Sequence, residues 1–378
     1  MNILFTCGGT AGHINPALAL ADLFRTRHPD TKILFAGAVG DGMENTLVPQ
    51  AGYELRTLNV NSFRRKLNWA GLKHNCKAVC NLSKSRRQAK KLLDEFQPDL
   101  VVGTGGFASY PIAREAAKRG IPTAVHESNA VPGLTTRTLA NYADIVMVGF
   151  EDCRSHYPHP ERVVVTGTPV RPDFYSLTRK EAREKLGYTD DLPILLTYWG
   201  SLGAREMNSQ MAEFIRLECE ENAPFHHICG AGGGYKTLLT ALEQQGIDLK
   251  NYPNVELREY IYDMPAVMAS CDLIFSRAGA STISEILALH KPAVLVPSPN
   301  VTGDHQTKNA QLLSDKNAAV LLPEVECTAE KLYALATDLL ASPEKRQALT
   351  KNLAALSPAD ANEEIYKTLS KLAGKGPH

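Results

Sequence analysis

The sequence predicts an α/β protein built from two doubly wound, parallel-sheet domains. Short apolar runs alternate with helical patterns along the chain, as expected of parallel strands covered by helices on both faces. The pattern starts again after residue 166, and 378 residues are enough for two domains. Glycine-rich turns at 7–13, 103–111 and 199–206 follow predicted strands and lead into predicted helices.

In the first half, we predict strands at 2–7, 32–36, 100–102, 123–126 and 145–148. Apolar residues at i, i+3, i+4 and i+7 predict a first helix with one buried face: Ala17, Leu20, Ala21 and Phe24. Asn15 is its expected N-cap and Pro16 its expected first residue. His13 should therefore lie between the glycine turn and the helix.

In the second half, we predict strands at 194–198, 225–228, 255–258, 273–275 and 293–296. Pro169 and Pro172 indicate a linker, which gives domains at 1–166 and 167–357. A helix at 359–372 follows Pro358, and residues 358–378 are expected to pack back on the first domain. Two such domains facing each other would bind ligands at the carboxyl ends of their strands.

Composition excludes several classes of protein. Lys and Arg number 41 against 41 Asp and Glu, which argues against a general nucleic-acid binder. The eight cysteines lack C-x-x-C spacing, so we expect no disulfide framework or zinc site, as in the reducing cytoplasm. The N-terminal segment has no signal-peptide features, and no apolar run reaches the roughly 20 residues of a spanning helix.

The glycine-rich turns are suited to phosphate, because they expose backbone N–H groups at the positive ends of helices. One such turn alone is equally well explained as a tight strand-to-helix connection, but three favour a phosphorylated ligand. No G-x-x-x-x-G-K-[ST] or Asp-x-Asp motif occurs. The sequence therefore predicts neither a P-loop nor a carboxylate cage for a metal.

Two polar clusters lie in the second half. In "SRAGASTISE" (276–285), Thr282 and Glu285 have the spacing of a capping box. The alternative is that Glu285 accepts hydrogen bonds from a sugar diol. Polar residues also crowd the start of a predicted helix in "GDHQTKNAQLL" (303–313), and capping explains only one of them: Asp304, His305, Gln306 and Asn309.

Seven motifs, in family order across nearly the whole chain, resemble the MurG family of N-acetylglucosaminyltransferases. They are "GGTAGHINPALALA", "GTGGFASYP", "HESNAVPG", "GTPVR", "GSLGARE-MN", "SRAGASTISE" and "DHQTKNA". The resemblance implies the two-domain glycosyltransferase type B fold. It also implies inverting transfer of N-acetylglucosamine from UDP-N-acetylglucosamine to the 4-hydroxyl of undecaprenyl-pyrophosphoryl-N-acetylmuramyl-pentapeptide, in peptidoglycan synthesis.

The same resemblance implies the site residues. The backbone of Ile261 would face the uracil, Glu285 the ribose and Gln306 the N-acetylglucosamine. The other implied donor contacts are Thr10, Ala11, Gly12, Asn129, Arg171, Ser201, Ala280, Ser281, Thr282, Ile283 and Ser284. The acceptor would lie over the first two glycine turns, near His13, Gly105, Gly106, Tyr110, Glu127 and Asn129. Three residues depart from the family pattern: Ala11 and Trp199, where glycine is usual, and Leu202, where glutamine is common.

Residues 62–91 hold ten Lys or Arg and no Asp or Glu, interspersed with apolar residues. Such a surface is suited to anionic lipid headgroups, so the protein is expected on the cytoplasmic face of the cell membrane, as a peripheral protein. A solvated helix face and an RNA patch are the alternatives. No aromatic stacking platform accompanies the stretch, so RNA ranks below the membrane and no nucleic-acid partner is expected.

His13 and Glu127 are the candidate catalytic residues. A histidine can take a proton near neutral pH, so His13 is the candidate general base for the acceptor hydroxyl. Alternatively, it orients the hydroxyl while Glu127 or water takes the proton, or it only bonds a turn carbonyl.

Helix N-termini and polar groups would stabilise the leaving diphosphate. We therefore expect no protein-bound metal or cofactor, although a free divalent cation can assist. A UDP-sugar 2-epimerase and a non-catalytic nucleotide-sugar-binding protein are the alternative functions.

Overall fold

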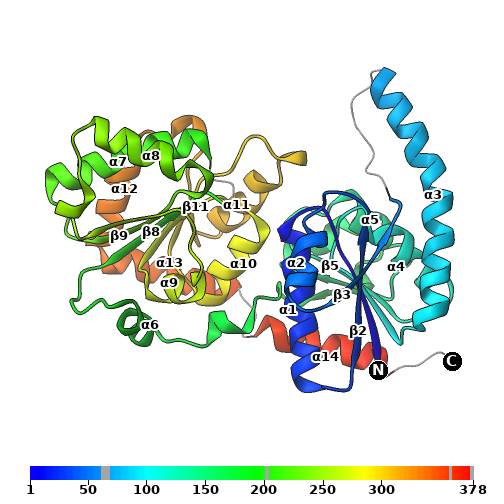
Figure 1. Ribbon diagram of the computed structural model, residues 1–378. Helices are drawn as coiled ribbons and strands as arrows, with labels where there is room; N and C mark the ends of the chain where they lie inside the picture. The colour runs from blue at the N-terminus through cyan, green and yellow to red at the C-terminus, as the bar shows by residue number, and fades with distance from the viewer. Residues whose placement is uncertain (61–68, 201–203, 357–359, 375–378) are drawn as a thin grey trace. The chain divides into compact units, whose positions relative to one another are not determined.

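The computed structural model describes residues 1–60, 69–200, 204–356 and 360–374, with backbone alone at 69–82. The chain divides into two compact units (Figure 1). Unit 1 contains Met1–Arg171 and the segment after Pro358, and unit 2 contains Pro172–Ser357. Each unit has its own parallel sheet, which confirms the predicted fold class.

The sheet of unit 1 has seven strands in the order β3-β2-β1-β4-β5-β6-β7, all paired in parallel. Order reverses between β1 and β4, so the sheet is doubly wound. The strands are β1 (Asn2–Thr6), β2 (Lys32–Ala38), β3 (Glu54–Leu58), β4 (Leu100–Gly103), β5 (Thr123–Glu127), β6 (Ile145–Val148) and β7 (Val163–Val165).

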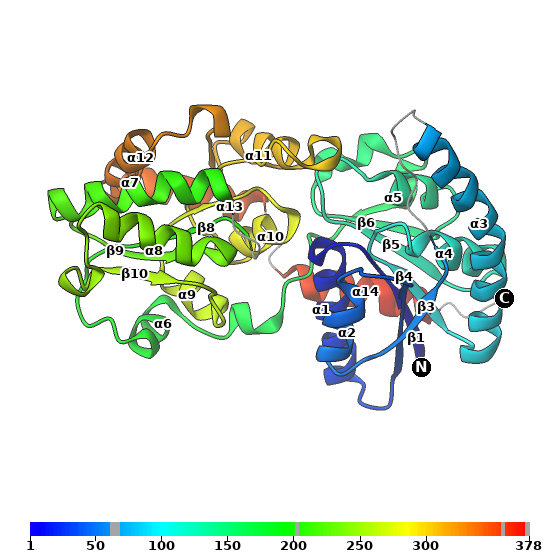
Figure 2. The same ribbon diagram turned by 45° about the horizontal axis from the view of Figure 1, so that its top comes forward.

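The α-helices of unit 1, within the described residues, are α1 (Ala11–Arg27), α2 (Glu44–Gln50), α3 (Trp69–Phe96), α4 (Ser109–Lys118), α5 (Leu134–Leu139) and α14 (Ala361–Ala373). The long helix α3 runs along the outside of the unit beside α4 in both views (Figures 1 and 2). Among the helices of the described residues, none combines the length and the apolar character needed to cross a membrane.

The predicted start of the first helix was wrong. Helix α1 begins at Ala11, directly after the N-cap Thr10, and Pro16 lies inside it. A proline at this position removes the hydrogen bond to the carbonyl four residues earlier, here that of Gly12, and the helix continues past it. His13 therefore lies on the first helical turn and not before the helix.

Helix α14 completes the core of unit 1. Ile365, Leu369 and Leu372 pack into the same buried cluster as Phe24 of α1. Asn362 anchors the start of the helix, because its side chain donates to the carbonyl of Val170 (2.8 Å) and accepts from the Val170 N–H (3.1 Å). Residues far apart in the sequence thus form one core.

The sheet of unit 2 has six parallel strands in the order β10-β9-β8-β11-β12-β13. They are β8 (Ile194–Tyr198), β9 (His226–Gly230), β10 (Val255–Arg258), β11 (Leu273–Ser276), β12 (Ala293–Leu295) and β13 (Val320–Leu321). The helices are α6 (Arg179–Leu186), α7 (Arg205–Glu221), α8 (Tyr235–Gln244), α9 (Met264–Ser270), α10 (Ala280–Leu289), α11 (His305–Asp315), α12 (Ala329–Ala341) and α13 (Pro343–Leu356).

All ten predicted strands are present, with ends shifted by at most two residues. The prediction missed β3, β7 and β13, which are all at sheet edges. Most residues of β3 are exposed or half-buried, and β13 has only two residues. Continuous apolar runs predict strands that are buried on both faces. Strand β3 lacks such a run, and β7 and β13 are only three and two residues long.

Candidate active site

The first two glycine-rich turns of unit 1 are in direct contact. A Cβ on Gly106 would lie 2.2 Å from the carbonyl oxygen of Gly8, and Gly106 has φ +79°. Only glycine fits both requirements at this position. The hydroxyl of Thr104 donates to the carbonyl of His13 (2.6 Å), which ties β4 to the start of α1. The two turns therefore form one rigid floor at the carboxyl ends of β1 and β4.

His13 is held on this floor in one tautomer. Its Nδ1 lies 3.1 Å from the carbonyl oxygen of Gly8. A carbonyl oxygen only accepts, so Nδ1 carries the proton and donates it. The hydroxyl of Thr10 lies 3.4 Å from the same nitrogen. In the neutral ring, the lone pair is then on Nε2, which is the form that a general base needs.

The ring of His13 also packs against the second turn. A Cβ on Gly105 would lie 2.6 Å from His13 Cδ2 and 3.1 Å from Nε2, so glycine leaves room for the ring. Thr10 has no side-chain capping bond at the start of α1. The N–H groups of Ala11 and Gly12 lie where no carbonyl within the helix can accept them. The floor therefore presents both N–H donors and an imidazole.

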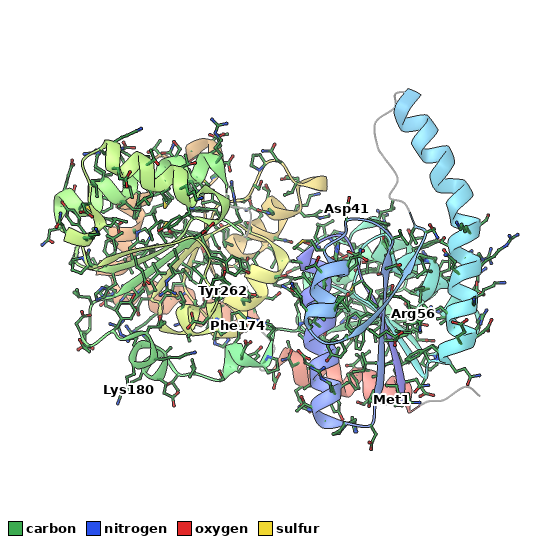
Figure 3. All side chains as sticks on the ribbon, viewed as in Figure 1. Met1, Asp41, Arg56, Phe174, Lys180 and Tyr262 are labelled. Carbon is green, nitrogen blue, oxygen red and sulfur yellow. The ribbon has the colours of Figure 1, made fainter. Side chains whose placement is uncertain are left out.

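Sequence reasoning missed Glu44, the first residue of α2, which is fully buried. One of its oxygens accepts from the N–H of Gly9 (2.8 Å) and the other from the N–H of Ala38 (3.2 Å). Asp41, labelled in Figure 3, lies three residues before Glu44, in the loop between β2 and α2. The only signal in the sequence was a carboxylate directly after a glycine-rich loop.

Glu127, at the end of β5, holds the loop that follows it. Its Oε1 accepts from the backbone N–H of Asn129 (3.1 Å) and from the Asn129 side chain (2.8 Å), and Oε2 accepts from the Gly133 N–H (2.9 Å). Both carboxylate oxygens are thus engaged with residues 129–133. Tyr110 lies in the first turn of α4 and is half-buried, with the guanidinium of Arg114 6.0 Å from its ring centre.

In unit 2, helix α10 begins at Ala280 with Gly279 as its N-cap. Thr282 and Glu285 lie inside the helix, so the capping-box explanation of Glu285 is wrong. Burial, followed by the negative charge of Glu285, raises the pKa of Tyr198, which places Glu285 near the end of β8. The Ser281 hydroxyl is buried and has no partner among the described residues.

Of the other predicted site residues of unit 2, some have side chains that contact their own helix, and others contact neighbouring loops. Ser284 donates to the carbonyl of Ala280 (2.8 Å) and Ile283 is buried, so both side chains serve the helix itself. The side-chain oxygen of Gln306 accepts from the Ser298 N–H (2.8 Å), which leaves its NH₂ end to offer. Asn309 donates to the carbonyl of Ala278 (3.2 Å) and so supports the turn before α10.

Three further positions complete the comparison with the sequence. Ile261 is buried, and within the described residues its N–H and C=O take part in no hydrogen bond. Arg171 is exposed at the last position of the first segment of unit 1. Ser201, Leu202 and the basic residues 64–66 lie outside the described residues.

Both halves of the chain match one family of enzymes. Residues 3–148 match the Glycosyltransferase family 28 N-terminal domain, and residues 194–365 match the Glycosyltransferase family 28 C-terminal domain. The crystal structure of Acinetobacter baumannii MurG has a TM-score of 0.75, with 24% identity, and covers 98% of this chain and 99% of that chain. The two sheets and their glycine turns therefore define a two-domain glycosyltransferase.

Curated relatives narrow the class to one family. The UDP-N-acetylglucosamine–N-acetylmuramyl-(pentapeptide) pyrophosphoryl-undecaprenol N-acetylglucosamine transferase of Thermoanaerobacter sp. is 38% identical over 98% of this chain and 100% of the relative. That of Acetivibrio thermocellus is 37% identical over 98% of both chains. The chain belongs to this family of N-acetylglucosaminyltransferases, as the seven motifs predicted.

A likeness in fold extends further. A putative UDP-N-acetylglucosamine 2-epimerase from Listeria monocytogenes has a TM-score of 0.65 at 13% identity and covers 99% of this chain and 96% of that chain. At this identity the likeness concerns the fold alone. The alternative of an epimerase is therefore tested by activity and not by architecture.

Proposed function

We propose that the protein transfers N-acetylglucosamine, with inversion, from UDP-N-acetylglucosamine to the 4-hydroxyl of undecaprenyl-pyrophosphoryl-N-acetylmuramyl-pentapeptide. The observation that carries the mechanism is the hydrogen bond from His13 Nδ1 to the Gly8 carbonyl (3.1 Å), which leaves Nε2 as the proton acceptor. The acceptor oxygen bonds to the anomeric carbon as its proton passes to Nε2. The bond from that carbon to the diphosphate breaks, and UDP leaves.

His13 is favoured over Glu127 as the base. Both oxygens of Glu127 already accept hydrogen bonds from Asn129 and Gly133, so this carboxylate holds the loop in place. The acceptor diphosphate would lie over the two glycine turns, where the first N–H groups of α1 point outward and favour an anion. Tyr110 and Asn129 would lie beside the acceptor sugar, and Thr10 beside the donor.

The donor would bind unit 2. The N–H and C=O of Ile261 would pair with the uracil, and Glu285 would accept from the ribose hydroxyls. The diphosphate would receive hydrogen bonds from Ser281, whose buried hydroxyl has no partner among the described residues, and from the first turn of α10. The NH₂ end of Gln306 would read the sugar. These donors stabilise the leaving group without a protein-bound metal, and a free divalent cation can assist.

Substrate turnover tests the reaction. The protein is incubated with labelled UDP-N-acetylglucosamine, with and without lipid-linked acceptor. Labelled disaccharide that forms only with acceptor supports the transferase. Conversion of the donor without acceptor would instead support an epimerase. Tight donor binding without any product would support a non-catalytic nucleotide-sugar-binding protein.

The variant His13→Ala tests the base. It should lose roughly 10²–10⁴ in kcat while it keeps donor affinity and melting temperature. His28→Ala is the matched control, because His28 caps the far end of the same helix and bonds Tyr366. A kcat of His13→Ala close to that of the parent would refute the assignment.

We also propose that the basic stretch 62–91 holds the protein to an anionic membrane surface as a peripheral protein. Of its described side chains, Arg86 and Lys90 lie 3.5 and 3.8 Å from Glu115, so these two charges are partly neutralised. The described part of α3 therefore offers less free charge than the sequence count indicates. Residues 64–66 are the better target for a test.

The test is co-sedimentation with vesicles that contain anionic lipid. Changing Arg64, Arg65 and Lys66 to Ser should weaken binding, by about 1 kcal/mol for each charge near the surface, and added salt should weaken binding of the parent. The control removes the same charge from unit 2, where Lys180 is labelled in Figure 3: Lys180→Ser, Lys185→Ser and Lys250→Ser. Equal sedimentation of the two triple variants would refute the proposal that the basic stretch 62–91 binds the membrane.

A further inference from the structure

The buried carboxylate of Glu44 fills a space that is lined by glycine residues. A Cβ on Gly8 or Gly37 would lie 2.7 Å from the Glu44 side chain, and a Cβ on Gly42 would lie 2.4 Å from its Oε2. Glu44 itself is 0% exposed. Three separate positions thus lack a side chain where this carboxylate needs room, although a buried carboxylate is costly unless it is hydrogen-bonded.

Glu44 and His13 bind opposite ends of one peptide group. The N–H of Gly9 donates to Glu44 Oε2 (2.8 Å). The carbonyl of Gly8, in the same peptide group, accepts from His13 Nδ1 (3.1 Å). The order of hydrogen bonds is therefore carboxylate, peptide N–H, peptide C=O and imidazole N–H. A hydrogen bond to one end of such a chain polarises the next and strengthens it.

We propose that Glu44 is a positioning residue that fixes the tautomer and orientation of His13 through the Gly8–Gly9 peptide. Negative charge at the N–H end makes the Gly8 oxygen a stronger acceptor, so the ring proton stays on Nδ1 and the lone pair on Nε2. A base oriented by a third group is a common device in catalysis, and here a peptide group lies between the two. Its effect on rate rests on the proposed function of His13.

The second glycine turn holds the other side of this arrangement. Gly106 packs on the Gly8 oxygen, and Gly105 packs on the His13 ring. The Gly8–Gly9 peptide therefore has no room to flip away from Glu44 while the turns stay in contact. The charge of Glu44 acts on His13 through a fixed geometry.

The experiment compares Glu44→Gln with the parent. The tautomer of His13 is read from ¹⁵N spectra of protein labelled at histidine, with the His13 signal assigned by its loss in His13→Ala. In Glu44→Gln the ring proton should redistribute toward Nε2. The value of kcat should fall about 10- to 100-fold, the range found when an outer partner of a metal-ligating histidine is removed, while donor affinity stays at the parental value.

Two further variants separate positioning from folding. Glu115→Gln is the matched control, because Glu115 is a second buried carboxylate of unit 1 whose partners, Arg86, Lys90 and Arg119, lie away from the turns. It should leave the His13 tautomer and kcat unchanged. Gly42→Ala keeps the charge of Glu44 but its Cβ pushes on Oε2, so it should shift tautomer and kcat in the direction of Glu44→Gln. If Glu44→Gln does not fold, Gly42→Ala still tests whether Glu44 positions His13.

The outcomes distinguish the two proposals. A parental tautomer in folded Glu44→Gln and in Gly42→Ala would overturn the positioning role, whatever the rate. A shifted tautomer in Glu44→Gln, together with a parental kcat in both Glu44→Gln and His13→Ala, would uphold the role of Glu44 and overturn His13 as the base.

Discussion

Replacing Gly106 by alanine should destabilise unit 1 strongly, because two independent costs meet at this residue. The φ of +79° is left-handed, which costs an L-residue roughly 1–2 kcal/mol. The new Cβ would also stand 2.2 Å from the Gly8 oxygen, and forcing an atom into a packed region typically costs about 1–3 kcal/mol. Together these give about 2–5 kcal/mol.

Gly120→Ala separates the two costs. Gly120 has φ +73°, and a Cβ there meets nothing within 4 Å. This control carries the backbone cost of roughly 1–2 kcal/mol without the contact. The difference between the variants, about 1–3 kcal/mol, is then the cost of separating the two glycine turns.

Urea unfolding followed by hydrogen exchange of peptides from β1 and α1 measures this difference within unit 1. Because the Gly8 oxygen holds His13, Gly106→Ala should also lower kcat, whereas Gly120→Ala should keep the parental kcat. Equal loss of stability in the two variants would show that the contact between the two glycine turns contributes nothing to stability. It would also refute the argument that this contact holds His13 in place.

Two other predictions concern unit 2. Glu285→Gln should weaken binding of UDP-N-acetylglucosamine in a titration and keep the parental melting temperature, because Gly279 caps α10 and no capping bond is lost; unchanged affinity would refute the ribose contact. Burial alone would lower the pKa of His227, but Glu218, 2.7 Å away, and then Cys229 together raise this pKa to about 10. The stability that this raised pKa contributes is fully present below pH 6.5 and is lost as the pH rises through about 10. The urea midpoint of the parent should therefore decrease as the pH is raised from 8 to 10.5. In the double variant Glu218→Gln, His227→Gln, this decrease should be smaller.

The sequence predicted the buried strands better than the edges, and the reason is physical. Strand β11, with a neighbouring strand on each side, is buried along its whole length, and three of its four residues are apolar. Edge strand β3 has one neighbour and exposed side chains, so its sequence carries a weak signal. The start of α1 failed for a different reason. Asn15 and Pro16 form a common start signal, but the glycine turn leads into the helix five residues earlier.

The site residues were predictable as a set, while their geometry was not. Motif spacing singled out His13, Glu127 and Glu285, yet spacing cannot tell which atoms of a side chain are already engaged. Three hydrogen bonds at Glu127 and one at His13 Nδ1 decide which residue can accept a proton. Glu44 lay outside every motif, because its partners are backbone groups at the end of β2 and in the turn after β1, and the folded sheet brings these two places together.

Because α14 comes last in the sequence, the core of unit 1 is completed only at the end of synthesis. During translation, all of unit 2 is synthesised before residues 361–373. Until then, the groove beside α1 that receives Ile365, Leu369 and Leu372 is bare, and the nascent first unit exposes apolar surface while more than half of the chain is still being added. A chain that ended near residue 360 would therefore have a complete second unit and a first unit with part of its core exposed to chaperones and proteases.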